Sequence, residues 1–199
     1  MRLFVAAGIS DETRDAMRRS RAAIEAAIAE ARVPPRITWA RDDVAHVTLC
    51  FIGEVTDDVA RAVEAALAAP LPIEPFDVEW GAIGVFPPGR GGLRSPRTIW
   101  LGASRGAAAL TALAAAVNDR LAPIVARGDD RPQTPHLTLG RVRQPGMGLS
   151  WADVLESARP QPTTSRIDRA TLYRSQLSPR GPTYTAICTA KFQVISSKL

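Results

Sequence analysis

The chain has 199 residues, of which 46% are hydrophobic, and this is enough to bury one sizeable core. No apolar run approaches the ~20 residues that a membrane-spanning helix needs, which excludes a protein built on such helices. The net charge is +5, and arginine carries nearly all of the positive charge because the only lysines are Lys191 and Lys198. Arginine suits phosphate ligands, but an arginine-rich composition equally suits a GC-rich genome, so charge alone identifies no ligand.

The first third of the chain predicts a strand, a helix and a second strand. Leu3 to Ile9 is apolar and strand-like, and Ser10-Asp11-Glu12 then supplies a capping hydroxyl and acidic first-turn residues. The helix has to end before Pro34. Its inward face is expected to carry Met17, Ile24, Ile28 and Ala31.

A second helix is predicted after Thr56, with Asp57 and Asp58 in its first turn and an end at Pro70. Its inward side chains are expected to be Val59, Val63 and Leu67.

The middle of the chain predicts two strands, Phe76 to Val85 and Thr98 to Ala103, on either side of a Pro/Gly/Arg-rich segment. We interpret that segment, residues 87–96, as a flexible connection. A third helix begins near Arg105 and ends near Pro123, with inward Leu110, Leu113, Val117 and Leu121. A further strand, a short helix and a final hairpin complete the prediction.

The only two histidines of the chain lie in the same four-residue pattern, His46-Val47-Thr48-Leu49 and His136-Leu137-Thr138-Leu139. Each pattern is followed by apolar residues, as in a short buried strand. Side chains alternate along a strand, so each histidine points the same way as its threonine. A lone histidine is most often a core residue, but the duplicated pattern favours a paired chemical role.

Two imidazoles and two hydroxyls on neighbouring strands suit in-line displacement at phosphorus. The ordinary histidine pKa of about 6.5 allows one copy to be protonated while the other is neutral. The hydroxyls of Thr48 and Thr138 can then donate to the non-bridging oxygens.

Two further residues, Phe51 and Arg141, each lie five positions after a histidine. Strict alternation turns such a residue to the opposite face of the strand, so Arg141 reaches a phosphate only if its strand ends or bulges first. The same offset weakens Phe51 as a residue that stacks on a base. A solvated arginine at a strand end remains the alternative.

Metal or disulfide chemistry is not indicated. Cys50 and Cys188 lie in apolar, strand-like contexts typical of reduced thiols, and the chain has no credible zinc set. We therefore expect no metal and no organic cofactor. Met1 to Val5 runs straight into a strand, so we expect a cytoplasmic protein without a leader. The terminal Ser197-Lys198-Leu199 fits a peroxisomal address pattern, which we interpret as a coincidence.

Several stretches resemble a known family, the two-histidine phosphoesterase superfamily, and within it the RNA 2′,3′-cyclic phosphodiesterases formerly named 2′-5′ RNA ligases. The resemblance rests on both His-x-Thr-Leu patterns with their flanks and covers essentially the whole chain; the flanking stretches are residues 37–55, 84–87, 97–102 and 172–184. The sequence departs from the family at Cys50, where a larger or basic residue is common.

The resemblance and the paired patterns together imply an α/β (α+β) fold with two lobes related by a pseudo-two-fold axis. Two antiparallel sheets would face a central cleft, with helices on the outside, in one domain spanning residues 1–199. By resemblance, His46 is the proton donor and His136 the proton acceptor, whereas the residues alone leave that assignment open. Arg141 and Phe51 are the candidate substrate-binding residues.

The implied activity is metal-independent hydrolysis of RNA or nucleotide 2′,3′-cyclic phosphate ends to 2′-phosphomonoesters. The expected partner is RNA or a nucleotide with such an end, with no membrane partner, and the expected state is a monomer. Two alternatives stay open at this point: an RNA- or nucleotide-binding module, and a 2′-5′ RNA ligase that uses the same cleft.

Overall fold

The structure, a computed structural model, describes residues 1–125, 134–178 and 181–193. The Ser197-Lys198-Leu199 terminus lies outside these residues. The elements in chain order are β1 (Arg2–Ala7), α1 (Asp11–Ala29), β2 (Arg36–Trp39), the 3₁₀ turn η1 (Asp42–Val44), β3 (Val47–Glu54), α2 (Asp57–Ala68), β4 (Phe76–Phe86), α3 (Gly89–Arg94), β5 (Thr98–Arg105), α4 (Ala107–Leu121), β6 (His136–Gln144), α5 (Trp151–Ser157), β7 (Thr163–Ile167), β8 (Arg169–Gln176) and β9 (Thr183–Lys191).

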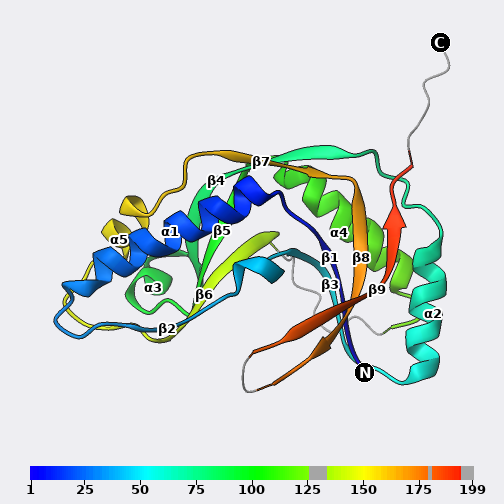
Figure 1. Ribbon diagram of the computed structural model, residues 1–199, viewed down its shortest axis with the longest axis horizontal. Helices are drawn as coiled ribbons and strands as arrows, with labels where there is room; N and C mark the ends of the chain where they lie inside the picture. Colours follow the sequence, from blue (N-terminus) through cyan, green and yellow to red (C-terminus); the bar gives the residue numbers. More distant parts are fainter. Residues whose placement is uncertain (126–133, 179–180, 194–199) are drawn as a thin grey trace, which may run out of the picture.

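The strands form two sheets, and every strand pair in them is antiparallel. The small sheet has the order β3-β1-β8-β9, and the large sheet has the order β2-β6-β5-β4-β7 (Figure 1). In the four strands β6-β5-β4-β7 of the large sheet, as in the small sheet, the motif strand lies first and pairs with the strand that leads into α4 or α1. The predicted pair of antiparallel sheets in an α+β fold is confirmed.

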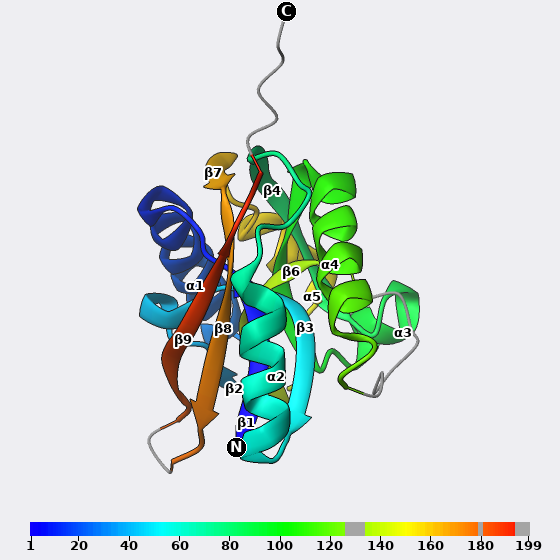
Figure 2. The same ribbon diagram turned by 90° about the vertical axis from the view of Figure 1, so that its right-hand side faces the viewer.

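Two of the helices, α1 and α4, are exchanged between the two sheets. Helix α1 follows β1 of the small sheet but packs on β7 of the large sheet and on α5, while α4 follows β5 of the large sheet but packs on β3 and α2. The side chain of Asn118 in α4 donates to the carbonyl of Leu49 in β3 at 3.1 Å. Figure 1 shows α1, α3 and α5 beside the large sheet, and Figure 2 shows α2 and α4 beside the small one.

The first two helices begin where the sequence predicts. The Ser10 side chain accepts a hydrogen bond from the Thr13 amide, and Thr56 caps α2 through the Val59 amide. The predicted inward residues Met17, Ile24, Val63 and Leu67 are buried. Three others are not: Ile28 and Val59 are partly exposed, and Ala31 lies beyond the end of α1 at Ala29.

Several details differ from the sequence prediction. The segment expected to be a flexible connection contains helix α3, and the short strands β2 and β7 were not predicted. Strand β1 ends at Ala7 rather than Ile9. Helix α4 begins after Gly106, whose φ of 82° is a left-handed conformation that favours glycine, and it ends at Leu121 before Pro123.

Both cysteines are free thiols, as the sequence predicts. They lie on β3 and β9, the two outer strands of the small sheet, with two strands between them, and this separation prevents a disulfide. Burial raises the pKa of the Cys50 thiol to about 11. Among the helices of the described residues, none is both long and apolar enough to cross a membrane.

Candidate active site with two histidines

Both histidines are held by the same local hydrogen bond. The Nδ1 atom of His46 lies 2.9 Å from the carbonyl oxygen of Val44, and the Nδ1 atom of His136 lies 2.8 Å from the carbonyl oxygen of Thr134. A carbonyl can only accept, so Nδ1 has to carry the proton in each ring. The other nitrogen, Nε2, is therefore the one left for a ligand in both copies.

A β-bulge follows the histidine–threonine pair in each motif strand. On β3, Thr48 lies opposite Ala6, but Cys50 lies opposite Val5, so Leu49 is an extra residue. On β6, the extra residue is Leu139. A bulge of this kind shifts the alternation of side chains by one position, so the residue five positions after the histidine returns to the histidine's face.

The bulges correct the expectation drawn from strict alternation. Phe51 lies opposite Phe4, and Phe4 alternates with Ala6, the partner of Thr48, so Phe51 shares the face of Thr48. By the same register, Arg141 lies opposite Thr98 and shares the face of Thr138. Phe51 is 51% exposed, and the Arg2 guanidinium lies 5.0 Å from its ring centroid.

Aromatic rings pack against His46 from three strands of the small sheet. The ring centroids of Phe4, Tyr184 and Tyr173 lie 4.8, 5.3 and 6.4 Å from that of the imidazole. Phe4 is the central ring of this group, since it also contacts both tyrosines. The rings restrict the imidazole and remove water from one side of it.

His136 has an equivalent aromatic wall in the large sheet. Phe86 meets its ring edge-on at 4.9 Å, and Trp100 lies 6.4 Å away and contacts Phe86 at 5.2 Å. The Trp100 indole lies over two glycines of the sheet: a Cβ atom built on Gly84 or Gly102 would come within 2.5 or 2.6 Å of it. These glycines let the indole lie close against the sheet.

Burial and nearby positive charges both lower the pKa of each imidazole. Burial lowers the pKa of His46 below its usual value, and the charges of Arg14 and His136 lower it further. Burial likewise lowers the pKa of His136, and Arg141 adds to this effect. The charge of His136 acts on His46, and strand β3 contacts strand β6, so the two motif strands meet where the sheets adjoin.

A phenol from the small sheet lies near the same arginine. Burial raises the pKa of Tyr184 above its ordinary value, while the positive charges of Arg141 and Arg2 oppose that rise. The charge of Arg141 in the large sheet thus acts on both His136 and Tyr184. Within the described residues, neither the Thr48 nor the Thr138 hydroxyl has a protein hydrogen-bond partner, which leaves both available to a ligand.

Sequence reasoning assigned no role to the aromatic residues around the two imidazoles, Phe4, Tyr173, Tyr184, Phe86 and Trp100. Their signal in the sequence is weak, because an aromatic residue in a strand usually belongs to the core.

A cavity of about 430 Å³ lies away from the two histidines, between α3 and the segment 145–152. In the described part of the chain, no three His, Cys, Asp or Glu side chains gather as a metal-binding group.

Comparison with known proteins agrees with this geometry. A family model described as the 2'-5' RNA ligase superfamily matches residues 11–178. The chain belongs to this superfamily. Its motif strands, β3 and β6, both lie within the matched region.

The relatives match over nearly their full lengths. The chain is 29% identical to an RNA 2',3'-cyclic phosphodiesterase of Archaeoglobus fulgidus, over 92% of this chain and 96% of the relative. It is 28% identical to the protein of the same name from Methanothermobacter thermautotrophicus, over 93% and 95% of the two chains. E. coli LigT complexed with 3'-AMP has a similar structure, with a TM-score of 0.69, 26% identity and coverage of 97% and 98%. A protein of Thermus thermophilus, at 24% identity, 96% and 98% coverage and a TM-score of 0.70, shows the same fold.

Proposed function

We propose that this protein is an RNA 2′,3′-cyclic phosphodiesterase that opens RNA or nucleotide cyclic phosphate ends to 2′-phosphomonoesters without a metal. The observation that carries the proposal is the pair of equivalent imidazoles, each with Nδ1 bonded to a main-chain carbonyl and Nε2 left for a ligand. Each has a threonine on the same strand face. The names of the relatives support this substrate class.

The proposed reaction uses the two imidazoles in opposite protonation states. Nε2 of His136 accepts a proton from water as the water oxygen bonds to phosphorus. The bond from phosphorus to O3′ breaks, and O3′ takes the proton from Nε2 of His46. The product is a 2′-phosphomonoester. His46 ends neutral and His136 ends protonated, so exchange with solvent restores both before the next turnover.

The lowered pKa values have a consequence for binding. Burial and positive neighbours both favour neutral imidazoles in the free protein. A bound cyclic phosphate is an anion, and an anion favours the imidazolium form of the group beside it. We therefore expect the acid histidine to gain its proton as the substrate binds. Thr48 and Thr138 would hold the non-bridging oxygens whose charge grows in the transition state.

The bulges place Arg141 and Phe51 on the same strand faces as the two threonines, where they can bind the phosphate and the base of the substrate. The charge of Arg141 acts on His136, and its planar guanidinium can bind a phosphate through two parallel hydrogen bonds. Phe51 offers a half-exposed ring on which a base can stack. E. coli LigT, which has a similar structure, has been solved with a nucleotide, 3'-AMP.

Two other functions would use the same site. A binding module would need neither intact proton-transfer group, whereas both copies here are intact and similarly oriented. A 2′-5′ RNA ligase would run the same displacement in reverse, but in water hydrolysis is the downhill direction. Hydrolysis is therefore the function that the geometry supports best.

The decisive experiment is phosphorus NMR of the product formed from a nucleoside 2′,3′-cyclic phosphate, compared with authentic 2′- and 3′-monophosphates. We expect the 2′-monophosphate. His46→Ala and His136→Ala should each lower turnover by about 10²–10⁴-fold, the usual contribution of one general acid or base. Circular dichroism would check that both variants are folded.

The outcomes separate the parts of the proposal. Near-wild-type rates in either histidine variant would overturn the acid–base mechanism. A predominant 3′-monophosphate would overturn the assignment of His46 as the acid toward O3′, even if both histidines were essential. Binding of the cyclic nucleotide without turnover would favour the binding module.

A further inference from the structure

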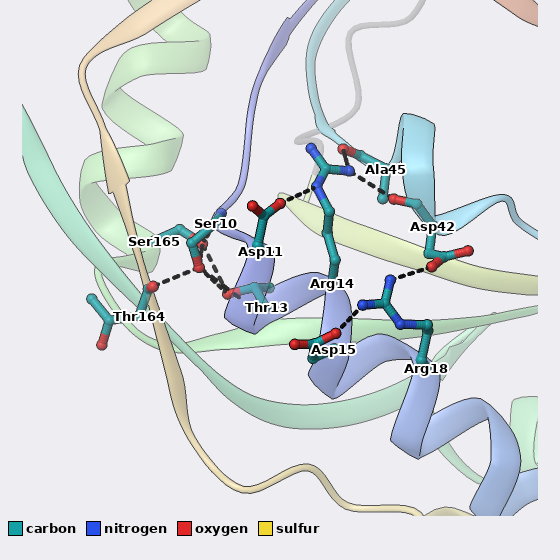
Figure 3. A network of polar contacts seen from close by, with 10 residues as sticks. All are labelled: Ser10, Asp11, Thr13, Arg14, Asp15, Arg18, Asp42, Ala45, Thr164 and Ser165. Carbon is teal, nitrogen blue, oxygen red and sulfur yellow. Dashed lines mark hydrogen bonds and ion pairs between the residues drawn. The ribbon is translucent and has the colours of Figure 1, made fainter.

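Arg14, in the first turns of α1, binds the main chain just before His46. Its guanidinium Nη1 donates to the carbonyl oxygen of Asp42 at 2.6 Å and to that of Ala45 at 3.3 Å (Figure 3). Its Nε lies 3.5 Å from a carboxylate oxygen of Asp11. The side chain is mostly buried, with a relative exposure of 21%.

The two carbonyls that Arg14 binds lie on either side, along the chain, of the carbonyl that accepts the hydrogen bond from His46. Asp42 begins the turn η1, and Ala45 is the residue that directly precedes the histidine. Between them lies Val44, whose carbonyl accepts the Nδ1 proton of His46. By fixing the turn on both sides, Arg14 fixes the carbonyl that sets the tautomer and direction of the imidazole.

The helix that carries Arg14 is itself fastened to the other sheet. The Ser10 hydroxyl donates to the carbonyl of Thr164 at 2.9 Å, and the Ser10 amide donates to the Ser165 hydroxyl at 3.0 Å (Figure 3). The Thr13 hydroxyl lies 2.9 Å from that of Ser165. Ser165 belongs to β7 of the large sheet, the sheet of His136, so Arg14 connects His46 of one sheet to the other.

We propose that Arg14 is a positioning residue that holds His46 in register with His136 through the main chain of η1. This inference rests on the proposed function, because the register matters only if both imidazoles act on one phosphate. In-line displacement needs the acid and the base on opposite sides of phosphorus, so a shift of one imidazole relative to the other removes the alignment.

The charge of Arg14 adds an electrostatic effect on the same imidazole. The charged or titratable groups that face His46 are Arg14 from α1, His136 from β6, and Tyr173 and Tyr184 from the small sheet. The nearby carboxylate of Asp42 is turned to Arg18. Arg14 lowers the pKa of His46, so its removal should raise that pKa and leave His136 unaffected.

The chain allows a direct test, because its only two imidazoles give only two sets of histidine NMR signals. The variants are Arg14→Met, which removes charge and hydrogen bonds, and Arg14→Lys, which keeps the charge but loses the guanidinium fork. Arg61→Met is the matched control, since Arg61 is an exposed helix arginine paired with Asp58. The two histidine variants assign the signals.

In Arg14→Met we expect kcat for a cyclic nucleotide to fall roughly 10–100-fold, in keeping with a misplacement of about 1 Å, while KM changes little. The His46 titration should move to higher pH and the His136 titration should stay in place. One limb of the kcat/KM pH profile should move with it: the alkaline limb if His46 is the acid, the acid limb if it is the base. Arg14→Lys should keep the wild-type His46 titration and recover only part of kcat.

Unchanged kcat with an unchanged His46 titration in Arg14→Met would overturn the inference. So would a loss of activity that follows only the folded fraction, with His46 titrating normally in the folded protein. Absence of turnover in the wild-type protein would instead count against the proposed function, and the NMR titration would still measure the link between Arg14 and His46.

Discussion

A single methyl group added at Gly84 should disturb His136 from the far side of Trp100. A Cβ atom on Gly84 would lie 2.5 Å from Cζ2 of Trp100, whereas carbon atoms in contact are about 3.5–4.0 Å apart, so the indole has to move by about 1 Å. Overpacking of this kind costs about 1–3 kcal/mol. For a chain of this size the melting temperature should fall by about 2–12 °C.

The displacement of Trp100 should also shift His136 and lower the rate of the reaction. Trp100 contacts Phe86, which meets the His136 ring edge-on. A shift of about 1 Å at a catalytic group can lower the rate by about 100-fold, so Gly84→Ala should lose up to that factor in kcat. The assays are thermal unfolding and hydrolysis of a cyclic nucleotide.

Gly91→Ala is the matched control, because a Cβ atom there meets nothing within 4 Å. It should keep wild-type turnover and should not lower the melting temperature. A Gly84→Ala protein with wild-type turnover and a lowered melting temperature would refute the idea that Trp100 positions His136. A wild-type melting temperature would refute the overlap itself.

Four further results are expected. Thr48→Ala and Thr138→Ala should each lower kcat by about tenfold or somewhat more, less than the loss of either histidine; an equal loss would contradict their role as hydrogen-bond donors to the phosphate. Turnover should survive exhaustive EDTA treatment, and a loss restored by one divalent ion would mean that the site is wrongly interpreted. Arg141→Met should raise KM and move the His136 titration to higher pH, because the charge that lowers the His136 pKa is gone; unchanged values of both would exclude it from the site. The pKa values of His46 and His136 are lowered in the folded protein, so the unfolded chain binds protons more readily. The free energy of unfolding should therefore keep the full contribution of the two histidines above about pH 6.5, and lose it as the pH falls from there through their pKa values in the folded protein. Equilibrium denaturation across pH would show no such fall if both rings stayed as exposed as in the unfolded chain.

The sequence predicts the elements of this fold well where local physics decides them. Capping hydroxyls mark the starts of α1 and α2, and prolines mark where helices cannot continue. The prediction of a flexible connection over residues 87–96 is wrong, because their glycines and prolines disfavour a helix that the fold nevertheless forms as α3. Strands β2 and β7 are short, and each depends on pairing with a longer neighbour.

The candidate site shows the same division between local and tertiary causes. The faces of His46, Thr48, His136 and Thr138 follow from strand alternation alone. The faces of Phe51 and Arg141 depend on the bulges at Leu49 and Leu139, and a bulge arises from the register of the neighbouring strand, which no local pattern encodes.

Arg14 was missed for a related reason. Its position near the start of a helix suggests only a solvated charge or an ion pair with Asp11. Its contacts with Asp42 and Ala45 join segments about thirty positions apart and exist only after α1 has packed on the large sheet.

The exchange of helices between the sheets limits how the molecule can move. If the two sheets separated as rigid halves, α1 would be pulled from the strand it covers or from the strand it follows, and so would α4. Domain closure about a hinge is therefore a poor way for this fold to admit a substrate. Access is better provided by rotation of side chains at the rim, such as the half-exposed Phe51, because this leaves the packing of α1 and α4 between the sheets unchanged.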